Sequence, residues 1–236
     1  MDVFKAYLGC QCDSFHEAQK RNQERLARPF VTISREAGTG GITVSEKLIR
    51  LLGEQDKEAT CSWAVFDKNL VEEVIAEHHL AKEVKKFMPE DKRSETQAYF
   101  EELFNLHPSD WSLFHKTAET ILHLAQMGNV VMVGRGANVV TRKMPFGFHV
   151  RLIGSLPNRI KHIQDYYHLN HEQAAQFIQK EDRGRKDYLR KHFDKNIDDP
   201  LLYDAVINTD RVSYERAAHL IAGQILDIRS QIKGSE

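Results

Sequence analysis

The chain has 236 residues, 41% hydrophobic and 28% charged, a balance that supports one large folded domain, with or without an insertion, better than two. Lysine and arginine number 33 against 34 acidic residues, giving a formal net charge of -1. Nucleic-acid binders carry a basic excess and membrane spans need about 18 apolar residues in a row, so we expect no nucleic acid and no membrane as partners.

Residues 1–28 form a polar segment compatible with a helix, which Pro29 ends, and we interpret them as an N-terminal helical extension. The segment has an early acid and no small-residue cleavage site, so it does not resemble a signal peptide. Three cysteines, Cys10, Cys12 and Cys61, are too few for a disulfide framework, and no second pair stands at zinc-site spacing. We therefore expect free thiols, no metal held by these cysteines, and a cytoplasmic protein.

The rest of the chain, residues 29–236, alternates short apolar runs with helical patterns. Five runs have the length of strands: 29–34, 63–66, 129–134, 148–154 and 204–209. Several are apolar on both faces, which is typical of a parallel sheet covered by helices. The alternation of strands with helices predicts a doubly wound α/β fold.

Helical patterns separate these runs. One covers residues 44–53, with Gly53 as its expected C-cap, and another covers 110–127, where apolar residues at 3.6 spacing predict a buried face. Residues 169–193 read as a helix, a basic segment and a second helix. An amphipathic helix is predicted for residues 214–232.

A glycine-rich turn, REAGTGGIT (35–43), joins the first strand run to a helix. Such turns bring backbone N–H groups and a helix N-terminus close to phosphate oxygens. Against the phosphate-loop pattern G-x-x-x-x-G-K-[ST], Gly41 stands at the lysine and Ile42 at the hydroxyl position. We expect a surface loop that binds a nucleotide phosphate through six residues: Gly38, Thr39, Gly40, Gly41, Ile42 and Thr43. The alternative is a strand–helix turn that binds nothing.

Further segments match one family in order and spacing. They are ISREAGTGG, FDKNLVEEV, VVMVGRGANVV, FHVRLIGSLPNRIKHI, DRGRKDYLRKHF and YDAVINTDRVSYERAAHLI, and together they span about residues 30–222. The chain resembles the cytidylate kinase-like proteins, a branch of the P-loop nucleoside monophosphate kinases. The resemblance implies a P-loop three-layer α/β sandwich with a five-stranded parallel sheet, a helical insertion at about 67–127 and a lid at about 180–195. It also implies ATP, Mg²⁺ and a nucleoside monophosphate, with cytidylate suggested.

Three residues at the ends of strand runs are candidates for the site. Arg35 is the nearest cation that could supply the charge of the missing lysine, or it could pair with a local acid. By resemblance, Asp67 faces the acceptor or Mg²⁺, although it could equally cap the helix starting at Lys68. Arg135 lies between two glycines that we expect to leave room for a ligand, and its guanidinium suits bidentate contact with the acceptor phosphate. The alternative for Arg135 is a surface arginine in a turn.

The predicted lid carries seven bases and four acids between Lys180 and Lys195. By resemblance, Arg183, Arg185 and Arg190 would close over the transferred phosphoryl group. The alternative is a solvated helix face.

The sequence thus favours ATP-dependent phosphoryl transfer to a nucleoside monophosphate, cytidylate being suggested by the resemblance. The rival hypothesis is a protein that binds or senses nucleotides through the same cleft without catalysis. The missing lysine and Ile42 favour the rival, whereas the arginines favour the enzyme. Homo-oligomerisation is compatible with either hypothesis.

Overall fold

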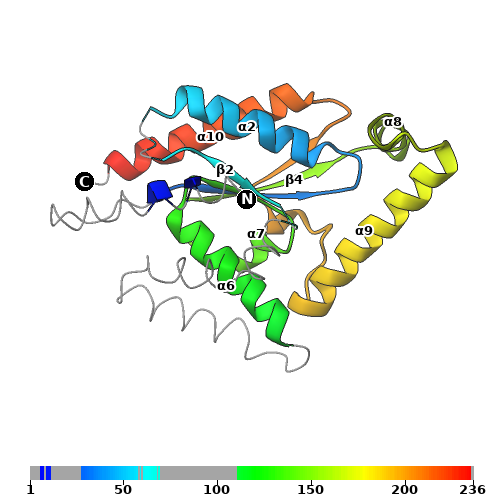
Figure 1. Ribbon diagram of the computed structural model, residues 1–236, viewed down its shortest axis with the longest axis horizontal. Helices are drawn as coiled ribbons and strands as arrows, with labels where there is room; N and C mark the ends of the chain where they lie inside the picture. Colours follow the sequence, from blue (N-terminus) through cyan, green and yellow to red (C-terminus); the bar gives the residue numbers. More distant parts are fainter. Residues whose placement is uncertain are drawn as a thin grey trace.

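A computed structural model describes residues 6–7, 9–11, 28–57, 59, 61–67, 69 and 111–234 (Figure 1). Five strands form a parallel sheet in the order β2-β3-β1-β4-β5. Their bounds are β1 (Phe30–Arg35), β2 (Ala64–Phe66), β3 (Val130–Val133), β4 (Gly147–Ile153) and β5 (Ala205–Asn208). All five strand predictions are therefore confirmed to within one residue, and so is the parallel sheet.

Helices cover both faces of the sheet. Their bounds are α2 (Gly41–Gln55), α6 (Trp111–Met127), α7 (Ala137–Val140), α8 (Leu156–Tyr167), α9 (His171–Phe193) and α10 (Tyr214–Gly234), with a 3₁₀ turn η1 (Pro200–Leu202). Figure 1 shows α2 and α10 side by side over one face and α6 under the other, which gives the three predicted layers. The pair α8 and α9 lies beyond the carboxyl ends of the strands.

The two halves of the core follow the alternation of side chains along the strands. Val131 and Val133 of β3 pack in a cluster with α2 and α10. Val130 and Met132 of the same strand pack on the other face, against α6. The predicted buried face of α6 is confirmed, since Ala118, Ile121, Leu122 and Ala125 are all buried.

Two helix predictions are wrong in detail. Helix α2 continues through Gly53 and ends at Gln55; its C-cap is Asp56, whose backbone N–H donates to the carbonyl oxygen of Leu52. Helix α9 is continuous through Gly184, where a basic segment between two helices was predicted. Ion pairs at i,i+4 spacing stabilise this stretch, including Arg185 with Glu181 at 2.9 Å. Glycine costs a helix only about 1 kcal/mol, and the ion pairs together with the packing of Ala174, Ile178 and Leu189 keep the helix continuous.

The described residues of the predicted N-terminal extension are anchored to the domain. Tyr7 is buried, and its hydroxyl donates to the carbonyl oxygen of Gly128 at 2.6 Å. Cys10 forms a disulfide with Cys61, so the expectation of free thiols is wrong for this pair. The pairing also removes the argument from thiols for a reducing compartment.

The predicted insertion at 67–127 is described only at its ends. Residues 68 and 70–110 lie outside the described part of the chain, and α6 forms the end of the insertion that is described. Among the helices that the structure describes, none is long and apolar enough to cross a bilayer.

Candidate functional site

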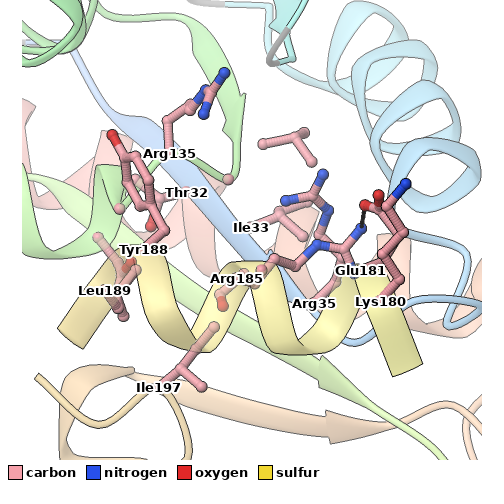
Figure 2. Close-up of a pocket in the computed structure, with 16 residues that line it drawn as sticks. Thr32, Ile33, Arg35, Arg135, Lys180, Glu181, Arg185, Tyr188, Leu189 and Ile197 are labelled. Atoms are coloured by element: carbon pink, nitrogen blue, oxygen red, sulfur yellow. Dashed lines mark hydrogen bonds and ion pairs between the residues drawn. The ribbon is translucent and has the colours of Figure 1, made fainter. Parts of the chain in front are cut away.

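A cavity of about 370 Å³ lies at the carboxyl ends of β1 and β3 and is covered by α9 (Figure 2). This is the edge of an open parallel sheet where ligands bind. Its charged lining is mostly cationic, formed by Arg35, Arg135, Lys180 and Arg185 together with the acid Glu181. Three predicted site residues, Arg35, Arg135 and Arg185, therefore lie together at the cavity. They come from the end of β1, the turn after β3 and α9.

Arg35 is a half-buried cation of this group. Burial, and after it the nearby charge of Arg185, lowers the pKa of Arg35 to about 10, while Glu181 and Asp67 act in the opposite direction. A buried guanidinium close to a second one is unfavourable unless negative charge compensates both. The cavity is therefore suited to an anionic ligand, which would relieve this repulsion.

Two glycines make room for the side chain of Arg35. A Cβ atom added to Gly41 would lie 3.0 Å from Cγ and 3.3 Å from Cδ of Arg35. A Cβ atom added to Gly134 would collide with Nη1 of the same side chain. Because Gly41 stands at the lysine position of the phosphate-loop pattern, Arg35 fills the space into which that lysine would extend.

Arg135 forms part of the cavity wall in a left-handed backbone conformation, with φ of 54°. Its guanidinium lies 5.5 Å from the ring centroid of Tyr188, and burial raises the pKa of Tyr188 to about 12. The flanking glycines, Gly134 and Gly136, also line the cavity. A Cβ atom added to either one would collide with a side chain, that of Arg35 at Gly134 and that of Phe193 at Gly136.

Asp67 follows β2 directly, at the same edge of the sheet as Arg35. Its charge raises the pKa of Arg35, although it does not line the cavity. The helix that we expect to start at Lys68 lies outside the described residues. Within the described stretches, from residue 28 to 67 and from 111 to 234, no three His, Cys, Asp or Glu side chains are grouped to hold a metal ion.

The glycine loop is buried in its middle and accessible at its ends, so the expectation of a surface loop holds only in part. Thr39 is fully buried, and a Cβ atom added to Gly40, where φ is 72°, would lie 2.5 Å from Cζ of Tyr214. Gly38 is packed as closely against the backbone of Arg159 in α8. None of residues 38–43 lines the cavity, and Ile42 is 38% exposed.

The three predicted lid arginines lie on different faces of α9. Arg185 lines the cavity and bonds to Glu181 and Asp182 on its own helix. Arg183 and Arg190 line a separate groove on the other side of the helix. The side chain of Arg183 is 83% exposed, so in this structure the pair lies outside the cavity.

Sequence reasoning missed residues that share the cavity face of α9, namely Glu181 and Tyr188. Both stand three or four positions from Arg185, which is the spacing of side chains on one face of a helix. This spacing could have identified them from the sequence. It also missed Asp182 and Arg159, which lie against the glycine loop. That contact joins three segments that are distant in the sequence, so no local sequence pattern could have predicted it.

Comparisons with known proteins fit this geometry. The model of a family described as the cytidylate kinase-like family matches residues 30–211. No curated protein matches the chain. A structure of an uncharacterized protein from Eubacterium ventriosum is similar, with a TM-score of 0.65 and 20% identity over 85% of this chain and 99% of that one. It shares the fold.

Two further solved structures are more distant. A shikimate kinase from Bacteroides thetaiotaomicron has a TM-score of 0.44 and 13% identity, over 84% of this chain and 98% of that one. A gluconokinase from Sinorhizobium meliloti has a TM-score of 0.41 and 12% identity, over 89% and 95%.

Proposed function

Because the chain belongs to the cytidylate kinase-like family and has the fold of P-loop kinases, we propose that it transfers the γ-phosphoryl group of ATP to a nucleoside monophosphate. Cytidylate is the acceptor that the family description suggests. The observation that carries the proposal is Arg35, a half-buried guanidinium close to Arg185 at the edge of the sheet where ligands bind. Such a cation cluster is stabilised by an anion such as a phosphate.

The three cavity arginines have two roles in the proposed reaction. Phosphoryl transfer needs the two substrates in line and the charge on the transferred group neutralised. Arg35 and Arg185 supply that positive charge, and Arg135 holds the acceptor phosphate through its planar guanidinium. The glycine loop, residues 38–43, and the N-terminus of α2 bind the donor phosphates.

Magnesium has one protein ligand in this proposal, the carboxylate of Asp67. Ile42 cannot supply the hydroxyl ligand that phosphate loops usually provide. Mg²⁺ is nevertheless commonly held by one or two carboxylates together with substrate phosphates and water, so the residues present are compatible with it. When bound, the ion neutralises charge on the donor phosphates.

A second candidate function is nucleotide binding without turnover. Gly41 and Ile42, in place of the lysine and the hydroxyl residue, favour this alternative. It predicts ATP affinity without acceptor-dependent release of ADP.

The test is a panel of nucleoside monophosphates with ATP and Mg²⁺, in which ADP release and ATP binding are both measured. Acceptor-dependent ADP release that is lost in Arg35→Met supports the proposed reaction, because methionine keeps the apolar stem and removes the charge. ATP binding without ADP release for any acceptor favours the second candidate. Failure to bind any nucleotide rejects both.

A further inference from the structure

The carboxylate of Asp182, on α9, accepts a hydrogen bond at Ala37, the residue that directly precedes the glycine loop (38–43). Its Oδ1 accepts the backbone N–H of Ala37 at 2.7 Å. Its Oδ2 lies 2.5 Å from Nη1 of Arg159, whose side chain is only 11% exposed. Arg159 also donates to the carbonyl oxygen of Ala37 at 3.3 Å. A backbone N–H group and a buried guanidinium thus converge on one carboxylate.

These donors are the ones that phosphate takes. Backbone N–H groups in a glycine-rich turn before a helix bind anions, and arginine forms charge-assisted bonds with phosphate oxygens. We infer that, in the ligand-free protein, the Asp182 carboxylate holds the place of a nucleotide phosphate at the glycine loop. Nucleotide then binds only when α9 withdraws this side chain. The inference rests on the proposed function, since it takes the ligand to be a nucleotide.

Asp182 also links the loop to the cavity. Its Oδ1 accepts from Nη1 of Arg185 at 3.3 Å, and Arg185 lines the cavity. An anion in the cavity competes with Asp182 for Arg185, and a phosphate at the loop competes with it for the N–H of Ala37. Each ligand therefore weakens the hold of Asp182 and favours binding of the other. Because such coupling is reciprocal, the two affinities rise by the same factor.

The test compares Asp182→Ala with Asp187→Ala, using ADP without magnesium as the probe. Both substitutions remove one negative charge from α9 and replace aspartate with the same helix former. The side chain of Asp187 is 59% exposed and lies 3.9 Å from Arg183, on the face away from the cavity. Asp182→Ala leaves Arg159 with Glu36, 3.7 Å from its Nε, so the variant keeps a partner for the buried guanidinium.

Asp182→Ala is expected to bind ADP about tenfold more tightly than the parent in calorimetry, since it no longer offers a competing charged hydrogen bond. Asp187→Ala is expected to stay within about twofold. In the ligand-free protein, hydrogen exchange of the Ala37 amide should become faster in Asp182→Ala only.

Unchanged or weaker ADP binding by Asp182→Ala, with the parent still binding, overturns the inference and leaves the proposed function standing. Weaker binding would assign Asp182 to holding the loop in its binding shape. Unchanged exchange of the Ala37 amide also overturns it. Absence of ADP binding from all three proteins rejects the proposed function, and the inference with it.

Discussion

The side chain of Arg35 occupies the space that Gly41 leaves open at the start of α2. An added Cβ at Gly41 would lie 3.0 Å from Cγ of Arg35, so a lysine at this position and the arginine cannot coexist without displacement. Under the proposed function, the cation that serves the glycine loop comes from the end of β1 instead of the first turn of α2. This relationship accounts for the glycine at position 41, whereas Gly40 is required by its φ of 72° and by the ring of Tyr214.

The relationship predicts that the cation can be moved back to the helix. Arg35→Ala should lower kcat/KM for phosphoryl transfer by about a hundredfold or more, as for loss of one well-placed charge donor. In the double variant Arg35→Ala/Gly41→Lys, the lysine has the vacated space, and at least about tenfold of the loss should be regained. Steady-state kinetics checks this. If the double variant is no better than Arg35→Ala, Arg35 does not replace the lysine.

The two faces of α9 predict unequal roles for its arginines. Arg185→Ala removes a cation from the cavity and should lower kcat/KM by about a hundredfold. Arg190→Ala removes the same charge from the opposite face of the helix and should change it by less than about threefold. The ratio of the two effects, measured at matched substrate concentrations, is the test. Equal losses would mean that α9 rotates about its axis during turnover.

His149 predicts how stability depends on pH. It is buried, with Nδ1 2.8 Å from Oγ1 of Thr32, and burial lowers the pKa of His149 below the ordinary 6.5, although Asp204 acts to raise it. Below about pH 6.5 the unfolded chain then binds more protons than the folded one, so the free energy of unfolding falls as the pH falls.

His149→Gln, which keeps a polar partner for Thr32, should reduce this slope by at most about 1.4 kcal/mol per pH unit. Denaturant unfolding of the parent and the variant between pH 5 and pH 8 measures the difference. Identical slopes would show that His149 is protonated alike in both states.

The disulfide between Cys10 and Cys61 closes a long loop, with a sequence separation of 51. Its reduction should lower the free energy of unfolding by about 2 to 4 kcal/mol, and Cys61→Ser should do the same. Thermal unfolding with and without reductant, with thiol counting by mass spectrometry, checks the prediction. A reductant effect that persists in Cys61→Ser would assign the loss to something other than this bond.

The strands could be predicted because a run that is apolar on both faces is a local signal. The helix end at Gly53 and the break within residues 169–193 were predicted wrongly because local sequence preferences of about 1 kcal/mol do not decide where a packed helix ends. The position of the Arg35 side chain could not be predicted from the sequence. It depends on the space beside Gly134, which lies next to Arg35 only because β1 pairs with β3. The bond between Asp182 and the loop likewise depends on how α9 folds back over the sheet.

The continuity of α9 sets how the site can open. A helix of 23 residues is about 34 Å long, so a tilt of about 10° about its first turn moves its far end by about 6 Å. This one continuous helix carries Asp182, Arg185 and Tyr188, so the three side chains move together when the helix moves as a rigid body. Under the proposed function, a movement of α9 would therefore release the glycine loop, free Arg185 and withdraw Tyr188 in one step. Binding of both substrates and release of both products would then depend on the same movement of α9, and the rate of this movement would set an upper limit on kcat.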